Sequence, residues 1–269
     1  MRLSAITTED GPASVVSDEE GGRVDPGEAE ALVGSLGAAA AGPLAAADAA
    51  GALIAPLRPG KIVAIGLNYL DHIREAGMHP PERPLVFSKF VSSIAGPHQD
   101  IVIDPALTER VDWEVELAVV IGRPMRAVPA GEALEYVLGY TVANDVSARD
   151  VQFADGQWVR AKSFDTFCPI GPAVVLSDEI LDPQTLRLTT TVNGETVQDS
   201  STAEMVFGVA ELLEFCSRSF PLMPGDLLLT GTPWGCGEFM EPPRSLRDGD
   251  VVECAVEGIG SLRNAVRSL

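Results

Sequence analysis

Three acidic residues have the types and the spacing of a site for a hard divalent cation. Glu114 and Glu116 are two positions apart in the largely apolar run Asp112–Ile121, and side chains two positions apart on a strand project from the same face. Asp145 comes just after a second apolar run, Gly139–Ala143. Three carboxylates without a histidine or a thiol favour Mg²⁺ or Mn²⁺. The spacing does not show that the three converge, and an ordinary strand with its polar face in water is the alternative.

A histidine and a glutamate form a second candidate group. His72 and Glu75 are three positions apart in the segment Gly66–Glu75, so a short helix there would place both on one face. A carboxylate beside an imidazole fixes its tautomer and raises its basicity, as a water-activating general base requires. The alternative is a solvent-exposed polar turn. Three prolines between positions 80 and 84 stop the helix, and residues 69–83 are predicted to form a lid.

One lysine and one turn are further candidates. Only three of the 19 basic residues are lysines, so a surviving lysine is a candidate for a role that arginine cannot fill. Lys162 stands among small and aromatic residues in Trp158–Asp165. Residues 226–233 are typical of a strand that runs into a Gly/Thr turn. Backbone N–H groups there, with the hydroxyls of Thr230 and Thr232, could hold a carboxylate.

The charge of the chain narrows the class of partner. A formal net charge of −20 repels nucleic acid and anionic lipid headgroups. It would also repel a small anionic substrate unless a bound cation inverts the local field. The most apolar stretch, residues 43–56, contains Asp48 and is bounded by prolines, so it does not resemble a membrane span. Residues 1–12 carry acids and no apolar core of the length that a signal peptide has. We therefore expect a soluble cytoplasmic protein without nucleic-acid or membrane partners.

The cysteines carry no recognisable metal or disulfide motif. Four cysteines stand far apart with no C-x-x-C pair, and the chain has three histidines. This spacing argues against a structural zinc site and predicts free thiols in a reducing compartment.

From Lys61 onward the chain alternates between short apolar runs and turns, which predicts a mostly β roll or sandwich. The predicted strands are Lys61–Ile65, Leu85–Phe87, Ile101–Ile103, Val115–Ile121, Tyr140–Ala143, Ala173–Leu176, Leu186–Val192, Leu227–Leu229 and Val251–Val256. The Asn193-Gly194 pair predicts a two-residue hairpin. Besides the short helix that would carry His72, we expect helices at Gly131–Leu138 and Ala203–Ser217.

The first part of the chain has a different character. An Ala/Gly-rich stretch at residues 27–50 has helix-like content, and residues 56–60 resemble a linker. The prediction is a small N-terminal domain at residues 1–57 and a metal-binding catalytic domain at residues 58–269.

The order of the motifs resembles the fumarylacetoacetate hydrolase family. They are G-L-N-Y-x-x-H-x-x-E, D-W-E-V-E-L, G-Y-x-x-x-N-D-V-S-A-R-D, K-S-F-D-x-F-x-P-I-G-P, V-N-G-E-x-x-Q, P-G-D-x-x-x-T-G-T-P and G-I-G-x-L-x-N, and they run from Lys61 to Val266. The resemblance implies a mostly β fold with some α, a mixed β-sandwich roll with a small N-terminal domain, and a homodimer.

The resemblance also implies roles for residues at the matching positions. Glu114, Glu116 and Asp145 would be the ligands of Mg²⁺ or Mn²⁺. His72 and Glu75 would be the water-activating dyad on the lid, and Lys162 the catalytic lysine. The expected substrate-binding residues are Arg149, Gln152, Gly231 and Thr232.

The implied activity is that of a divalent-metal-dependent hydrolase or decarboxylase. It would act on a C–C bond of a small anionic 2-oxo or 2,4-dioxo acid, of acylpyruvate, fumarylpyruvate or oxaloacetate type, through an enolate that the metal stabilises. An isomerase of a 2-hydroxymuconate-type ring-cleavage product is the alternative. A non-catalytic family member is a third reading, against which the intact dyad and lysine argue.

Overall fold

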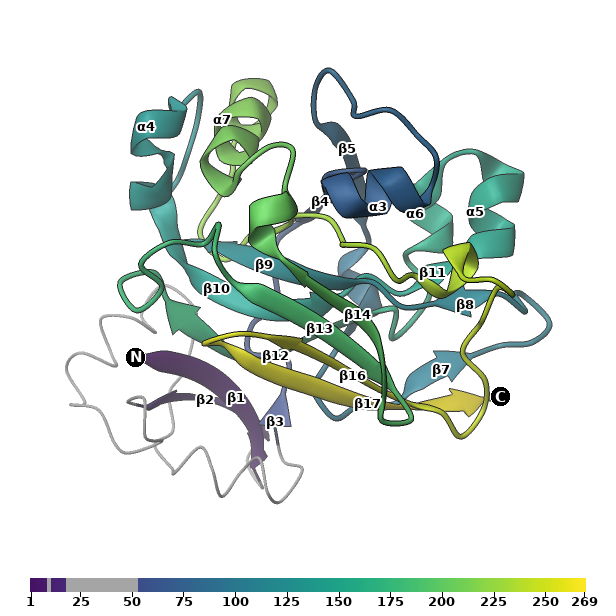
Figure 1. The fold of residues 1–269 in the computed structure, drawn as a ribbon. Helices are drawn as coiled ribbons and strands as arrows, with labels where there is room; N and C mark the ends of the chain where they lie inside the picture. The colour runs from purple at the N-terminus through teal and green to yellow at the C-terminus, as the bar shows by residue number, and fades with distance from the viewer. Residues whose placement is uncertain (9–10, 18–52) are drawn as a thin grey trace.

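The computed structural model describes residues 1–8, 11–17 and 53–269 (Figure 1). These residues form a ten-stranded sheet, a five-stranded sheet and a two-stranded pair. The helix-like content predicted for residues 27–50 lies outside the described residues.

The largest sheet has the order β2-β1-β12-β10-β9-β15-β4-β5, with β3 beside β1 and β6 beside β12. Its strands are β1 (Arg2–Thr8), β2 (Gly11–Ser17), β3 (Leu53–Ile54), β4 (Ile62–Gly66), β5 (Leu85–Lys89), β6 (Ile94–Ala95), β9 (Val115–Ile121), β10 (Val137–Asn144), β12 (Cys168–Leu176) and β15 (Leu227–Leu229). Every residue of β9 and β15 is buried. Both strands therefore lie in the core with both faces covered, which explains their nearly continuous apolar sequences.

The five-stranded sheet packs against the large one. Its order is β14 (Glu195–Ser201), β13 (Arg187–Val192), β16 (Val251–Val256), β17 (Gly260–Ser268) and β7 (Ile101–Ile103). Strands β17, β16 and β13 contact β12, β10 and β9, and apolar side chains from both sheets fill one core. Burial alternates along β16, as expected for a strand with one face toward the core. The short pair β8 (Val111–Asp112) and β11 (Ser147–Ala148) lies beside the start of β9.

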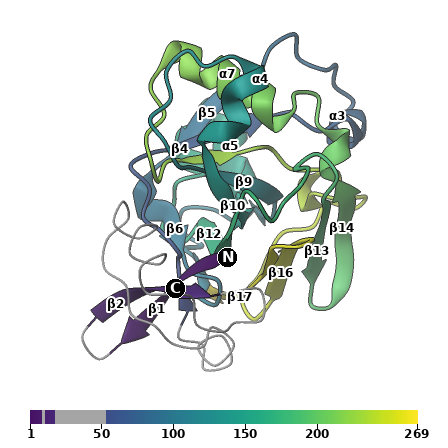
Figure 2. The same cartoon turned by 90° about the vertical axis from the view of Figure 1, so that its left-hand side faces the viewer.

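Short helices gather on one side of the sheets (Figures 1 and 2). They are α3 (Leu70–Glu75), α4 (Ala130–Ala133), α5 (Arg149–Asp155), α6 (Trp158–Ala161) and α7 (Val209–Ser219), with 3-10 turns η1 (Val91–Ser93), η2 (Leu134–Tyr136), η3 (Thr202–Glu204) and η4 (Gly237–Phe239). Helices α3, α5 and α6 lie together in Figure 1, where each contributes residues to the site described below.

The predicted fold class is confirmed, and several strands agree with their predicted bounds. Strands β7, β9, β15 and β16 match them residue for residue. The predicted hairpin joins β13 and β14 through Asn193 and Gly194, whose φ angles are 54° and 81°. Two positive φ values are what a type I′ turn requires, and the Asn-Gly pair tolerates both.

Two predicted helices were wrong in extent. The helix expected at Gly131–Leu138 is replaced from Val137 by β10, because pairing with β9 in the buried sheet outweighs local helix preference. The helix expected from Ala203 begins at Val209. The Glu211 side chain accepts a hydrogen bond from the N–H of Gly208 at 2.8 Å, which caps the helix there. Sequence reasoning missed α5 and α6 and, among the described strands, β1, β2, β3, β6, β8, β11 and β17.

The described N-terminal residues belong to the main sheet. Strand β1 pairs with β12, with Leu3 opposite Val174, and Leu3 is 1% exposed in a cluster that includes Ile170. Most of the predicted N-terminal domain lies outside the described residues, so its boundary at residue 57 stays a prediction.

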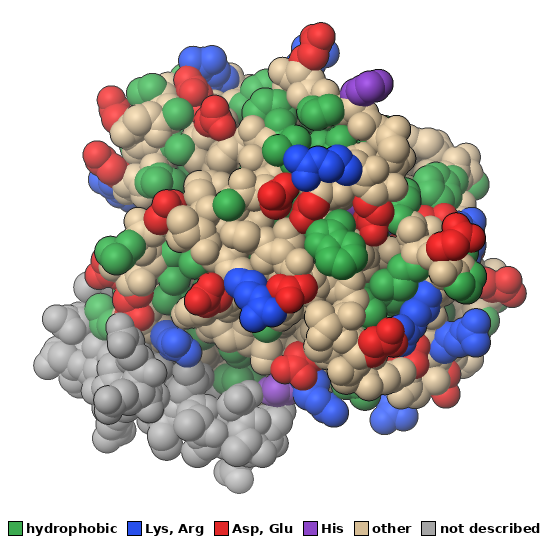
Figure 3. All heavy atoms as spheres, viewed as in Figure 1, with side chains coloured by type: hydrophobic (Ala, Val, Ile, Leu, Met, Phe, Trp, Pro, Cys, Tyr) green, Lys and Arg blue, Asp and Glu red, His purple; other side chains and the backbone are tan. Residues whose placement is uncertain are grey.

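Charged side chains of both signs are scattered over the face drawn in Figure 3, among apolar and uncharged groups. Within residues 1–8, 11–17 and 53–269, no helix has the length and apolar character needed to cross a membrane. All four cysteines lie in the described part of the chain and are free thiols, as predicted.

Candidate active site

The three carboxylates predicted to bind a metal meet where β9 begins and β10 ends. The antiparallel register sets Ala143 opposite Glu116, and the N–H of Asp145 donates to the carbonyl of Glu114 at 2.9 Å. One oxygen from each of Glu114, Glu116 and Asp145 lies within 4.8 Å of the others, so the group could hold a metal ion. Their exposed fractions are 5%, 1% and 0%. The alternative of a strand with its polar face in water was therefore wrong.

Two buried lysines contact these carboxylates. Lys162 follows α6, and its Nζ donates to Glu114 Oε2 at 2.8 Å, Asp145 Oδ2 at 2.7 Å and Ser147 Oγ at 2.8 Å. Lys89 ends β5, and its Nζ lies 2.6 Å from Asp145 Oδ1. Sequence reasoning assigned no role to Lys89. Its one signal was the scarcity of lysine, which did not distinguish it from the solvent-accessible Lys61.

An arginine ties the acidic group to a second buried aspartate. Arg149 begins α5, and its Nη2 lies 2.7 Å from Glu114 Oε1 and 2.8 Å from Asp112 Oδ2. Asp112 also accepts the N–H of Gly237 at 2.7 Å, which attaches the η4 turn to the site. Asp112 was missed as a site residue, although it is the first acid of the D-W-E-V-E motif. Arg149 Nη1 donates to Gln152 Oε1 at 3.0 Å, so two predicted substrate-binding residues touch each other.

The buried charges do not cancel. Among the described residues, the group comprises four carboxylates and three cations: Asp112, Glu114, Glu116, Asp145, Lys89, Arg149 and Lys162. With all of them ionised the sum is four negative and three positive charges, or −1. A divalent cation would change this sum to +1, which would attract an anionic substrate into an otherwise acidic protein.

Glu116 is the carboxylate that lacks a cationic partner. Burial and the neighbouring carboxylates of Asp145 and Glu114 raise the pKa of Glu116 well above its ordinary value. Burial alone would also raise the pKa of Glu114, but Lys162 and Arg149 lower it to about 2. Glu116 Oε2 accepts the N–H of Gly231 at 2.7 Å. The donors are hard oxygen atoms, and a cation bound beside Glu116 would supply the positive charge that this carboxylate lacks. Both features fit Mg²⁺ or Mn²⁺.

The backbone at position 231 requires glycine. Its φ is +98°, and a Cβ there would lie 3.0 Å from the Cβ of Asn68 and 3.2 Å from the carbonyl oxygen of Ile65. Only glycine allows this turn to bring an N–H to Glu116.

The predicted dyad forms on α3. His72 Nδ1 lies 3.1 Å from Glu75 Oε2, and Glu75 Oε1 accepts the N–H of Gly235 at 2.9 Å. The His72 and Phe239 rings meet in a T-shaped arrangement with a centroid distance of 5.2 Å. His72 is 7% exposed, so the alternative of a solvent-exposed polar turn was wrong. Because Glu75 engages Nδ1, Nε2 is the nitrogen left to exchange a proton with another molecule.

A cavity of about 190 Å³ lies between His72 of the dyad and the carboxylates of Glu114 and Glu116. Its polar lining consists of His72, Glu114, Glu116, Arg149, Gln152, Lys162 and Thr232. Its apolar lining, which sequence reasoning did not anticipate, includes Ile65, Met78, Phe87, Phe153, Trp158 and Phe239. Glu75, Asp145 and Gly231 do not line the cavity; they contact lining residues from behind.

A buried glutamine fixes the Gly/Thr turn. Gln198 Nε2 donates to Thr232 Oγ1 at 3.0 Å, while its Oε1 accepts the N–H of Val115 at 3.0 Å. The Thr232 oxygen therefore acts as an acceptor toward Gln198, which leaves its O–H as a donor for the cavity.

Known proteins resemble this chain over most of its length. The family model described as fumarylacetoacetate (FAA) hydrolase C-terminal matches residues 61–267. A *Rattus norvegicus* protein named oxaloacetate tautomerase Fahd2a, mitochondrial, is 50% identical over 215 residues, which cover 79% of this chain and 68% of the relative. A *Methanocaldococcus jannaschii* protein is 50% identical over 214 residues, covering 80% of this chain and 86% of that protein.

Two solved structures resemble this chain in comparisons that cover its full length. The 5-carboxymethyl-2-hydroxymuconate delta-isomerase from *Mycobacterium smegmatis* is 40% identical with a TM-score of 0.81, covering 100% of this chain and 99% of that one. The fumarylacetoacetate hydrolase from *Exiguobacterium antarcticum* is 36% identical with a TM-score of 0.85, covering 100% of both chains. Together with the matched family model, these similarities show that the chain belongs to the fumarylacetoacetate hydrolase family.

Proposed function

We propose that this protein interconverts the enol and keto forms of a small 2-oxo dicarboxylic acid of the oxaloacetate type, with Mg²⁺ or Mn²⁺ as cofactor. The observation that carries the proposal is the shared cavity: His72, held by Glu75, faces the same space as Glu114, Glu116 and Lys162. A proton-transfer group thus stands beside a cation-binding group, as enolate chemistry requires.

The volume of the cavity favours a small substrate. Pockets for drug-sized ligands measure roughly 300–1,000 Å³, whereas this cavity measures about 190 Å³. A four-carbon dicarboxylic acid suits this space better than an extended ring-cleavage product. The apolar walls would exclude water from the reacting carbon.

Each polar lining residue has a task in this proposal. A divalent cation held by Glu114, Glu116 and Asp145 would polarise the 2-oxo group and stabilise negative charge on its oxygen. His72 Nε2 would take the proton from C3 of the keto form and deliver a proton to the C2 oxygen, which gives the enol; the enol-to-keto direction would reverse both transfers. The Lys162 ammonium would counter the developing charge. The Thr232 hydroxyl and the Gln152 amide would orient the carboxylates.

The names of relatives support isomerisation over bond cleavage. The *Rattus norvegicus* relative is named a tautomerase and the *Mycobacterium smegmatis* protein an isomerase. Hydrolysis or decarboxylation of a 2-oxo or 2,4-dioxo acid is the second candidate, favoured by the His72–Glu75 pair, which suits activation of water. The *Exiguobacterium antarcticum* protein is named a hydrolase.

One assay panel tests both candidates. Enol oxaloacetate, keto oxaloacetate and an acylpyruvate are supplied in turn with Mg²⁺, with Mn²⁺ and with a chelator, and enol absorbance, pyruvate and free carboxylic acid are followed. We expect metal-dependent loss of the enol signal to be faster than release of pyruvate or acid. If pyruvate or acid is released faster than the enol signal is lost, the second candidate is correct and tautomerisation is not the main activity. Turnover that is unaffected by chelation would overturn the metal assignment.

The oligomeric state and the location of the enzyme are also proposals. We expect a homodimer, which light scattering can measure. We also expect a cytoplasmic location, without nucleic-acid or membrane partners. The name of the rat relative includes the word mitochondrial, so localisation of a tagged full-length chain tests the compartment.

A further inference from the structure

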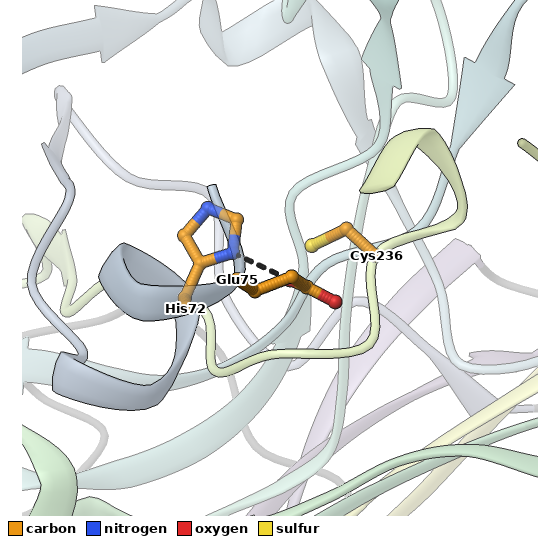
Figure 4. A group of neighbouring side chains, drawn as sticks. All are labelled: His72, Glu75 and Cys236. Atoms are coloured by element: carbon orange, nitrogen blue, oxygen red, sulfur yellow. Dashed lines mark hydrogen bonds and ion pairs between the residues drawn. The ribbon is translucent and has the colours of Figure 1, made fainter. Parts of the chain in front are cut away.

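A second group of side chains with metal-ligand chemistry adjoins the cavity. His72 and Glu75 on α3 face Cys236, which lies in the loop between β15 and η4 (Figure 4). One ligand atom of each residue lies within 4.8 Å of the other two. Cys236 is 0% exposed and His72 7% exposed. The N–H of Gly235 donates to Glu75 Oε1, so the loop that carries the thiol is attached to the helix that carries the other two ligands.

The spacing is close to that of a tetrahedral centre. Bond lengths of about 2.0–2.3 Å place neighbouring ligand atoms of a tetrahedral zinc site about 3.3–3.8 Å apart. His72 Nδ1 and Glu75 Oε2 are 3.1 Å apart. All ligand atoms lie within 4.8 Å of one another, so the thiol would have to move by about 1 Å at most.

The chemistry of the three ligands differs from that of the three carboxylates. Sulfur, imidazole nitrogen and one carboxylate oxygen favour a thiophilic borderline cation such as Zn²⁺ or Co²⁺, whereas Mg²⁺ prefers oxygen alone. Across the described ranges, these two groups are the clusters of three or more such ligands. None of the other cysteines, Cys168, Cys216 and Cys254, belongs to one.

We propose that His72, Glu75 and Cys236 form a binding site for a thiophilic divalent cation of the Zn²⁺ type, and that its occupation switches the enzyme off. The binding of the ion rests on the geometry above. The loss of activity rests on the proposed function, because it follows only if His72 transfers protons during the reaction.

Binding would exchange a proton for the metal. The Cys236 thiol would lose its proton to solvent as the metal–sulfur bond forms. The negative charges of the thiolate and of the Glu75 carboxylate would then offset the two positive charges of the cation. The ion and the proton therefore compete for the sulfur atom of Cys236.

A spectroscopic titration separates this site from the carboxylate site. The full-length protein is saturated with Mg²⁺ and titrated with Co²⁺, whose bond to a thiolate gives a charge-transfer band in the near ultraviolet that oxygen ligands do not give. We expect the band in the parent and its loss when Zn²⁺ is added in competition. In Cys236→Ala the band should vanish and the affinity for this ion should fall by about 10–100-fold or more.

Matched variants keep the test decisive. Cys216→Ala removes another buried thiol, one that belongs to neither ligand group, and should keep the band. Cys236→Ser puts a hydroxyl of similar size in place of the thiol and should also lack the band, so it replaces Cys236→Ala if that variant does not fold. No band in the Mg²⁺-saturated parent, or the same band in the Cys236 variants, overturns the site.

An activity measurement then separates the site from its consequence. Zn²⁺ should inhibit the Mg²⁺-loaded parent and Cys216→Ala, and inhibit the Cys236 variants only at about 10–100-fold higher concentration. A cobalt band without inhibition by Zn²⁺ would support the site and overturn the proton-transfer role of His72. Equal inhibition of the parent and the Cys236 variants would overturn the switch.

Discussion

Lys89 Nζ lies 2.6 Å from Asp145 Oδ1, and neither side chain is exposed to solvent. Lys89 ends β5 and Asp145 follows β10, two strands that are not neighbours in the sheet. Lys162 contacts the other oxygen of Asp145 at 2.7 Å. Asp145 is therefore held between two buried ammonium groups, which orient it toward Glu114 and Glu116.

Replacement of Lys89 by methionine should destabilise the protein. Removing one partner of a buried ion pair leaves the other uncompensated and costs about 3–5 kcal/mol, and the remaining contact with Lys162 favours the lower end. The measurement is urea unfolding with a chelator present. Arg267→Met breaks an exposed pair with Asp100 and should cost less than about 1 kcal/mol. A Lys89→Met protein as stable as the parent would show that this pair contributes nothing to folding.

Replacement of Glu116 by glutamine should weaken metal binding. The amide keeps the shape and can still accept the N–H of Gly231, but it removes a negative charge from a hard-cation site. We expect Mn²⁺ affinity to fall by about 10–100-fold or more, with almost no turnover. Glu132→Gln, at an exposed position of α4, is the matched control in the Mn²⁺ titration. Equal Mn²⁺ binding by Glu116→Gln and the parent means that the three-carboxylate assignment is wrong.

Metal affinity should increase with pH. Burial, Asp145 and Glu114 raise the pKa of Glu116, so a proton on this carboxyl competes with the cation below that pKa. Mn²⁺ should bind more weakly as pH falls and release about one proton per ion in that range. Glu116→Gln should show a weaker pH dependence. An affinity of the parent that stays constant between about pH 5 and pH 8 would argue against this competition.

Lys162 should be replaceable by neither arginine nor methionine. Its Nζ has three acceptors at 2.7–2.8 Å in a fully buried site, which suits three ammonium N–H donors and not a planar guanidinium. Both variants should show a large fall in kcat. Lys162→Met should still bind Mn²⁺, because it removes a positive charge near the ligands. Near-normal kcat in Lys162→Arg would reduce the residue to a structural charge.

The lid prediction concerns residues 69–83. Tyr69 and Ile73 are buried at 0% and 2% exposure, whereas residues 77–80 are exposed. We expect slower hydrogen exchange after binding of oxalate, a non-reactive chelating mimic, with the largest change at residues 77–83. Ordering a fully disordered segment would cost about 1–2 kcal/mol per residue in backbone entropy. A ligand as small as oxalate could not offset that cost, so we expect the lid to be loosely ordered before the ligand binds. Identical exchange with and without oxalate would mean that the dyad is preformed and the lid does not close.

Local patterns determined much of the site. Glu114 directly precedes β9 and Glu116 lies within it, and the period of two expected for a strand predicted that both side chains project to the same side, where both line the cavity. The helical period brings His72 to Glu75. The Asn193-Gly194 pair determines its hairpin through two positive φ angles. These relationships depend on a few neighbouring residues, so the sequence alone was sufficient to predict them.

Long-range contacts were decided only by the tertiary structure. Asp145 reaches Glu114 because β9 and β10 pair in one register, and a shift of one residue would turn the side chains to the other face. Lys89 reaches Asp145 across 56 positions, and Cys236 approaches His72 from the far end of the chain. Sequence spacing carries no information about such distances. They are set by strand pairing and core packing, which also overrode the helix preference at residues 137–138 and buried the charges that a local pattern could have left in water.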